Sequence, residues 1–140
     1  MAYLDTSVLA AYYCPERISA KVQRRIERLA QATISPLVEL ELHSAVAGKV
    51  RAGEFDLPAA RRVLAMFQVH VSDGLFAIVP IGAREFDLSR RWIAEFRTPL
   101  RTLDVLHLAA AFANDLPLLT ADRDLAKAAK LLSVKHDLIA

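Results

Sequence analysis

Tyr3-Leu4-Asp5-Thr6-Ser7 opens the chain and decides its fold. Residues 2–4 are apolar and β-prone, which predicts a short buried strand. Asp5 stands where that strand would end, and residues 8–13 follow with helical spacing. In open parallel α/β sheets, ligands bind outside the carboxyl ends of the strands. Asp5 is therefore either a cap on the next helix or an acid at the functional edge of a sheet.

The composition indicates a globular protein, and we expect one domain over residues 1–140. Hydrophobic residues make up 54% and charged residues 24%, which excludes disorder. The net charge of +2 permits a nucleic-acid partner without requiring one. Cys14 is the only cysteine, which excludes an intrachain disulfide and a multi-cysteine zinc site. We find no signal peptide and no apolar run long enough to span a membrane, so we expect a cytoplasmic protein.

Strand-like and helical segments alternate along the chain. Further strands are expected at 33–34, 75–81, 117–119 and around Val134, and helices at 16–32, 36–50, 58–71, 83–96, 102–114 and 122–131. This alternation predicts a three-layer α/β fold with a parallel sheet. Pro80 predicts that 75–81 is an edge strand, because proline cannot donate to a ladder. Residues 49–67 are expected to pair two helices into an arm, whose apolar residues are either core or a partner surface: Phe55, Leu64, Met66 and Phe67.

Three more acids stand where carboxylates are costly. Glu41 falls on the apolar face of the helix after Ser35, whereas Glu39 falls outside it. Asp104 is the single acid of a helix that is apolar nearly all round, and Asp122 follows a strand as Asp5 does. A buried carboxylate normally has a charged partner or a metal. The structural alternatives are an ion pair for Glu41, a favourable helix N-terminus for Asp104 and a cap for Asp122.

Taken together, Asp5, Glu41, Asp104 and Asp122 predict a metal site. Carboxylates brought close together repel one another, and a hard divalent cation with oxygen ligands, Mg²⁺ or Mn²⁺, resolves that conflict. Such a site suits hydrolysis of a phosphodiester, because the metal lowers the pKa of the attacking water. His107, one turn after Asp104, is either a further ligand or a core histidine with a hydrogen bond.

Four motifs in order resemble the PIN-domain family, in particular the VapC-type toxin ribonucleases of toxin–antitoxin pairs. They are Tyr3-Leu4-Asp5-Thr6-Ser7-Val8-Leu9, then Ser35 to Leu42, Arg101 to Ala111, and Leu118 to Leu125. Their acids correspond to Asp5, Glu41, Asp104 and Asp122. Each motif alone is weakly specific, but four in register over nearly the whole chain are strongly so.

The resemblance implies a five-stranded parallel sheet between helices, with Asp5 on the central strand. It implies Mg²⁺- or Mn²⁺-dependent endoribonuclease activity on a structured or translation-related RNA. It also implies a homodimer and an antitoxin partner that wraps the toxin and inhibits it. Asp5 and Asp104 would be metal ligands, Asp122 would bind a second metal or act through water, and Glu41 would ligate or orient the attacking water.

Seven basic residues are candidates for holding RNA phosphates, which dominate nucleic-acid affinity: Lys49, Arg51, Arg61, Arg62, Arg97, Arg101 and Arg123. Arg101 and Arg123 are preferred because they flank Asp104 and Asp122, two of the four predicted metal ligands. A surface salt bridge is the alternative for each of the seven basic residues. Ser7 and Thr120 are expected to support the acids. One of Thr6 and Ser7 is expected to cap the first helix, while the other, most simply Ser7, reaches the pocket through a water.

Other acid-pocket folds fit less well. A haloacid-dehalogenase-type phosphatase needs a second aspartate two residues after the strand-end acid, where Ser7 stands. A receiver domain needs an acid after a later strand, where Ile81 stands. The remaining alternative is a PIN-like module that binds RNA or protein without cleaving. Such a module is expected to lack one of the four acids, and this sequence has all four.

Overall fold

The computed structural model describes residues 1–140 and contains a five-stranded, all-parallel sheet with seven helices. The strands are β1 (Ala2–Leu4), β2 (Ala32–Ile34), β3 (Phe76–Ile78), β4 (Leu118–Thr120) and β5 (His136–Leu138). The helices are α1 (Thr6–Tyr13), α2 (Ser19–Glu27), α3 (Pro36–Arg51), α4 (Leu57–Ser72), α5 (Ala83–Ala94), α6 (Thr102–Ala113) and α7 (Arg123–Leu131). This confirms the expected parallel α/β architecture.

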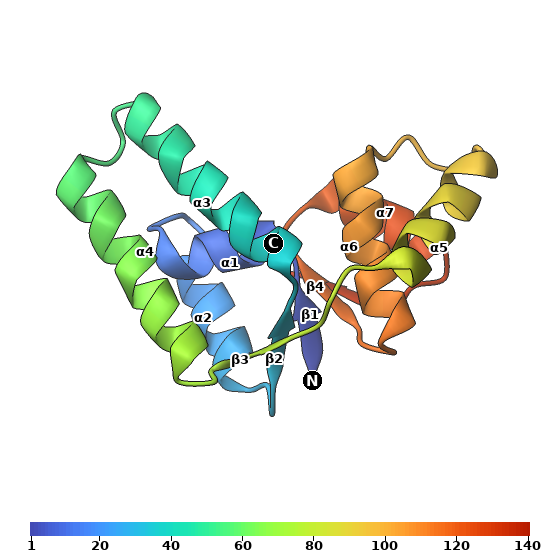
Figure 1. Ribbon diagram of the computed structural model, residues 1–140, viewed down its shortest axis with the longest axis horizontal. Coiled ribbons are helices and arrows are strands. Elements are labelled where there is room, and N and C mark those ends of the chain that lie inside the picture. The colour runs from blue at the N-terminus through green and yellow to red at the C-terminus, as the bar shows by residue number, and fades with distance from the viewer.

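The sheet has the strand order β3-β2-β1-β4-β5, so β1 is central as expected. Tyr3 pairs with Thr33 on one side and with Leu118 on the other. Figure 1 shows the sheet between two groups of helices, α1 to α4 on one side and α5 to α7 on the other. The carboxyl ends of β1 and β4 lie side by side, which brings the residues after each strand to one edge.

Burial of α6 explains its composition. Every residue from Val105 to Ala111 is buried, as the apolar sequence predicts. The helix contacts β1 and packs along α5. Asp104 lies in its first turn, before this buried segment, and the helix is exposed again at Phe112 near its other end.

Three predicted boundaries are wrong. The helix expected at 16–32 covers only Ser19–Glu27. It starts late because the Ser19 hydroxyl accepts from the Glu16 amide and donates to the Cys14 carbonyl, which makes a turn there. At the other end, Ala32 belongs to β2. Strand β3 is an edge strand, as predicted, but it ends at Ile78 before Pro80. Val134 precedes the last strand, and its amide donates to the Ala129 carbonyl to close α7.

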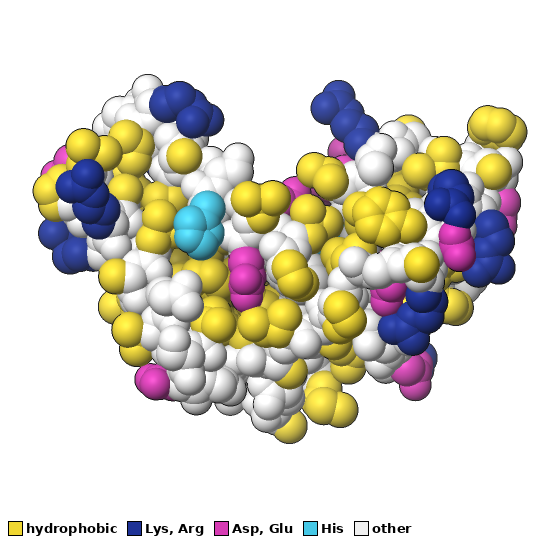
Figure 2. Space-filling model, viewed as in Figure 1, with side chains coloured by type: hydrophobic (Ala, Val, Ile, Leu, Met, Phe, Trp, Pro, Cys, Tyr) yellow, Lys and Arg dark blue, Asp and Glu magenta, His cyan; other side chains and the backbone are white.

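The segment 49–67 does form an arm, in which α3 and α4 pair as a helix hairpin (Figure 1). Phe67 belongs to the core, whereas Met66 is 57% exposed. Met66 and Phe55 line an apolar groove of about 380 Å³ beside Tyr13. Figure 2 shows the face between this arm and α6 hollowed, with basic side chains on both rims. None of the helices is long and apolar enough to cross a bilayer.

Candidate active site

Asp5 follows β1 directly and is only 3% exposed. Its Oδ1 accepts hydrogen bonds from the Ser7 hydroxyl at 2.6 Å and from the Val8 amide at 3.1 Å. The second bond makes Asp5 the N-cap of α1, which is one of the two roles considered for Asp5, whereas the expectation of a cap at Thr6 or Ser7 is wrong. Burial raises the pKa of Asp5, and the hydrogen bonds from Ser7, Thr120 and Val8 oppose that rise only in part.

Ser7 and Thr120 join the ends of β1 and β4 around this carboxylate. The Thr120 hydroxyl donates to Oδ2 of Asp5 and accepts from the Asp122 amide at 3.0 Å. The Ser7 hydroxyl, besides donating to Asp5, accepts from the Ala121 amide at 2.9 Å. Both residues therefore contact Asp5 directly, whereas the sequence had suggested a water between Ser7 and the site. Oδ1 of Asp5 has two donors and Oδ2 has one, so Oδ2 retains a free lone pair.

Glu41 projects from the second turn of α3 toward α1 and α6, and so points inward as the helical wheel predicts. Its Oε1 accepts from the Thr6 hydroxyl at 2.7 Å and is bonded to Nε2 of His107 at 2.5 Å. No bond occupies Oε2, and the side chain keeps 26% of its surface exposed. Burial alone would raise the pKa of Glu41, but the hydrogen bonds from His107 and Thr6 outweigh it, and the pKa is lowered. The structural alternative for Glu41, an ion pair with an arginine, is not found, and its partner is His107.

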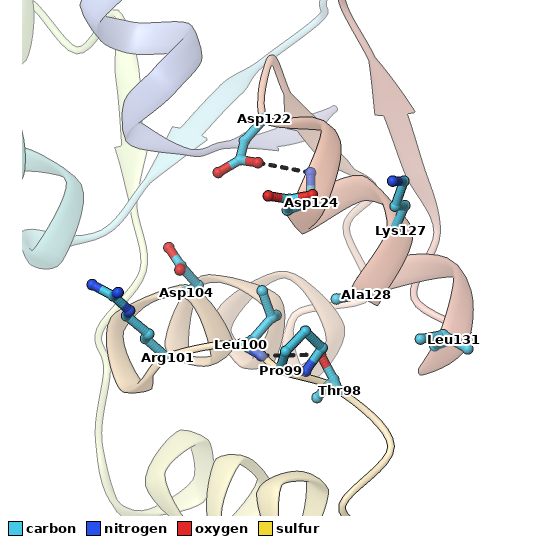
Figure 3. Close-up of a pocket in the computed structure, with 10 residues that line it drawn as sticks. All are labelled: Thr98, Pro99, Leu100, Arg101, Asp104, Asp122, Asp124, Lys127, Ala128 and Leu131. Atoms are coloured by element: carbon cyan, nitrogen blue, oxygen red, sulfur yellow. Dashed lines mark hydrogen bonds between the residues drawn. The ribbon is translucent and has the colours of Figure 1, made fainter.

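Asp104 and Asp122 face a common cleft of about 540 Å³. In Figure 3 their carboxylates point from α6 and from the start of α7 into the same space. Burial, and then the charge of Asp122, raises the pKa of Asp104, and Glu41 adds to the rise. Because Asp104 responds to the charges of Asp122 and Glu41, three of the four acids lie close enough to interact electrostatically.

Asp122 is also the N-cap of α7, since its Oδ1 accepts from the amides of Asp124 and Leu125 at 2.8 and 3.1 Å. The structure thus confirms the helix-cap role of Asp5 and of Asp122, and their role in a metal site stays a prediction. Each acid follows a strand and precedes a helix, so it stands at the sheet edge and at a helix N-terminus at once.

The two preferred arginines lie in different places. Arg101 lines the cleft with Asp104 (Figure 3), whereas Arg123 lines a separate depression beside Glu16 and Arg17. Lys49 and Arg97 are held in ion pairs with Glu54 and Glu95. These pairs match the salt-bridge alternative for both residues.

Lys127 also lines the cleft, and the sequence reasoning missed it. It comes from α7, one turn after Asp124, which lines the same cleft. The signal was the three-residue spacing from Asp124, which puts both side chains on one helix face.

A family model described as the PIN domain matches residues 2–131. The chain belongs to the PIN domain family. A search of curated proteins found no match. Several solved structures share the fold at low sequence identity.

Three of these structures illustrate the similarity of the PIN fold. VapC20 of Mycobacterium tuberculosis, a toxin that cleaves the sarcin-ricin loop, is 16% identical with a TM-score of 0.70, over 91% of this chain and 95% of that one. A toxin–antitoxin complex from Klebsiella pneumoniae is 21% identical with a TM-score of 0.64, over 90% and 91%. VapBC2 of Rickettsia felis, bound to a promoter DNA fragment, is 16% identical with a TM-score of 0.73, over 100% of both chains. At these identities, the likeness establishes the fold alone.

The donor chemistry of this PIN site fits a hard divalent cation. All four predicted acids offer carboxylate oxygens, and Oδ2 of Asp5 and Oε2 of Glu41 keep free lone pairs. Both ring nitrogens of His107 are in hydrogen bonds, which matches the core alternative for this residue. As they stand, no three acidic, histidine or cysteine side chains are close enough together to hold a metal ion. Asp5, Glu41, Asp104 and Asp122 therefore stay predicted ligands. Burial and neighbouring acids raise the pKa of Asp104, and a bound cation would lower it by favouring the charged carboxylate.

Proposed function

We propose that the protein is a metal-dependent endoribonuclease and the toxin of a type II toxin–antitoxin pair, with residues 1–140 acting as one PIN domain. The observation that carries this proposal is the linkage among the four acids. Thr120 connects Asp5 to the Asp122 backbone, Thr6 connects the start of α1 to Glu41, and Asp104 responds to the charges of Asp122 and Glu41. Mutually repelling carboxylates destabilise a fold, and such groups with shifted pKa values are typical of functional sites. The edge formed by the carboxyl ends of the strands is where α/β sheets bind their ligands.

The position of each residue supports the chemical role that we propose for it. Asp5 and Asp104, with help from Asp122 and Glu41, would hold Mg²⁺ or Mn²⁺, and that ion would supply an activated water and neutralise charge at the phosphate. The free Oε2 of Glu41 would orient that water. Arg101 and Lys127, which line the same cleft, bind phosphates of the RNA on either side of the scissile bond. Arg123 remains a candidate for a more distant phosphate.

The proposed protein partners are an antitoxin and a second copy of the chain. The toxin and toxin–antitoxin proteins among the structural neighbours support the antitoxin. The exposed Met66 and the apolar groove along the arm also support a protein partner.

The test compares the purified wild-type protein with Asp5→Asn on a panel of structured RNAs, with Mg²⁺, with Mn²⁺ and with a chelator. We expect the wild type to cleave only with metal and the variant to be at least about a hundredfold slower. Expression of the wild type, but not of the variant, is expected to arrest growth. Equal cleavage by both proteins would disprove the proposed site.

The alternative function is a PIN-like module that binds RNA or protein without cleaving it. This outcome predicts RNA binding that is unaffected by chelator and no cleavage with either metal. Since the same samples report binding and cleavage, one experiment separates the two functions.

A further inference from the structure

His107 is a buried histidine for which the proposed chemistry has no role. It is 3% exposed and lies on α6, one turn after Asp104. Its Nε2 contacts Oε1 of Glu41, and its Nδ1 lies 3.0 Å from the Tyr3 hydroxyl. The Tyr3 hydroxyl in turn lies 2.7 Å from the Ser35 hydroxyl, which caps α3. The chain of contacts thus begins and ends on the helix that carries Glu41.

The direction of each hydrogen bond follows from the end of this chain. An ionised carboxylate only accepts, so the proton between His107 and Glu41 belongs to Nε2. In a neutral imidazole, Nδ1 is then the acceptor, and the Tyr3 hydroxyl donates to it. Tyr3 keeps its proton because burial raises its pKa. The Ser35 hydroxyl donates to Tyr3, so each buried polar atom of the chain has a partner.

The two oxygens of Glu41 are not equivalent as a result. Oε1 accepts from Thr6 and from His107, which uses both of its lone pairs, and Oε2 accepts none. A carboxylate anchored through one oxygen presents the other in a fixed direction. A glutamate side chain that is 26% exposed would otherwise rotate among several rotamers.

We propose that His107, supported by Tyr3 and Ser35, is a positioning residue that anchors Oε1 of Glu41 together with Thr6 and leaves Oε2 as the working oxygen. The effect of this anchoring on catalysis rests on the proposed nuclease function. The anchoring itself is a property of the metal-free protein. Removal of a partner that orients an active-site ligand commonly costs 10- to 100-fold in activity.

Two matched pairs of variants test the effect on catalysis. Thr6→Val removes the hydroxyl at nearly constant volume and Thr6→Ser retains it. His107→Leu removes the N–H donor and His107→Gln retains one. We expect Thr6→Val and His107→Leu each to lower kcat by at least about tenfold with little change in KM, and both donor-retaining variants to stay near the wild type. A His107→Gln protein as impaired as His107→Leu, or a Thr6→Val protein as active as Thr6→Ser, would overturn the proposal.

A second measurement needs no cleavage at all. The metal-free protein labelled with ¹⁵N at its four histidines gives the proton positions on each ring, and the spectrum of His107→Gln assigns the signals of His107. We expect a proton on Nε2, and we expect Tyr3→Phe to shift the Nδ1 signal while the Nε2 proton stays. An Nε2 without a proton would refute the anchor, whether or not the wild type is a nuclease. Failure of the wild type to cleave RNA would instead refute the proposed function.

Discussion

At the scale of single residues, the site consists of carboxylates in surroundings that oppose their charge. Asp5 is buried and Asp104 lies near two other acids, so the pKa of each is raised. Glu41 is the opposite case, because the bonds from His107 and Thr6 lower its pKa. The charged forms of Asp5 and Asp104 therefore destabilise the folded, metal-free protein, as groups at active sites commonly do.

Asp104→Asn should reveal this cost. The folded protein holds a proton on Asp104 more tightly than the unfolded chain does, so the wild type loses stability as the pH rises through the raised pKa. The variant has no such loss. At pH 7 and without metal, we expect it to melt about 2 °C above the wild type while being inactive as a nuclease.

The control is the same comparison at low pH. Below the ordinary pKa of a carboxyl group, Asp104 is protonated in both the folded and the unfolded wild type, and the difference in melting temperature disappears. A variant that melts below the wild type at pH 7 would contradict the account of Asp104.

The helical wheel predicted that Glu41 points inward, but it gave no sign of the partner. The contact with His107 joins α3 to α6 across 66 positions of sequence. Only the sheet order brings these two helices together. Similarly, the sequence treated Tyr3 as strand packing alone, although its hydroxyl connects Ser35 to His107.

At the scale of elements, two strand–helix junctions carry acids with two roles. Asp5 caps α1 after β1, and Asp122 caps α7 after β4. The first and the last of the four motifs predicted these two junctions from sequence, because strand ends and caps have local signals. The ends of α2 and of β3 were missed, because Ser19 forms a turn and pairing along β3 stops before Pro80, which the alternation of hydrophobic residues does not register.

The two roles of Asp122 can be separated by substitution. Asparagine caps a helix as well as aspartate does, but it carries no charge. We expect Asp122→Asn to keep the wild-type stability and to lose most of the nuclease activity. Asp122→Ala loses the bonds to the Asp124 and Leu125 amides as well, and we expect a further cost of about 1 kcal/mol in the free energy of unfolding.

Urea unfolding and RNA cleavage by the same three proteins check this prediction. If Asp122→Asn cleaves like the wild type, then the charge of Asp122 has no part in the chemistry and Asp122 is a cap alone.

At the scale of the whole molecule, the cleft combines acids with basic side chains from two separate parts of the chain. Arg101 precedes α6 and Lys127 belongs to α7, and both line the cleft with Asp104 and Asp122 (Figure 3). Proximity in sequence to an acid suggested Arg101 and Arg123 equally. The structure distinguishes the two arginines, because Arg101 lines the cleft and Arg123 lines another depression.

Salt dependence of RNA binding tests this distinction. A phosphate contact adds about one to the slope of log affinity against log salt. We expect Arg101→Gln and Lys127→Gln each to weaken binding and to reduce the slope by about one, and Arg123→Gln to have a smaller effect. Arg90→Gln is the control, because Arg90 on α5 is 73% exposed, pairs with Asp87 and does not line the cleft. A larger loss from Arg123→Gln than from Arg101→Gln would contradict this assignment of the RNA path.

The central claim is that acids from four parts of the chain share one metal site. Anomalous diffraction from crystals grown with Mn²⁺ tests it most directly, because the signal locates the ion without reference to activity. We predict an Mn²⁺ peak in contact with the carboxylates of Asp5 and Asp104, and no such peak in Asp5→Asn. An ordered Mn²⁺ bound elsewhere, or none at these acids in crystals of a cleaving protein, would contradict the account.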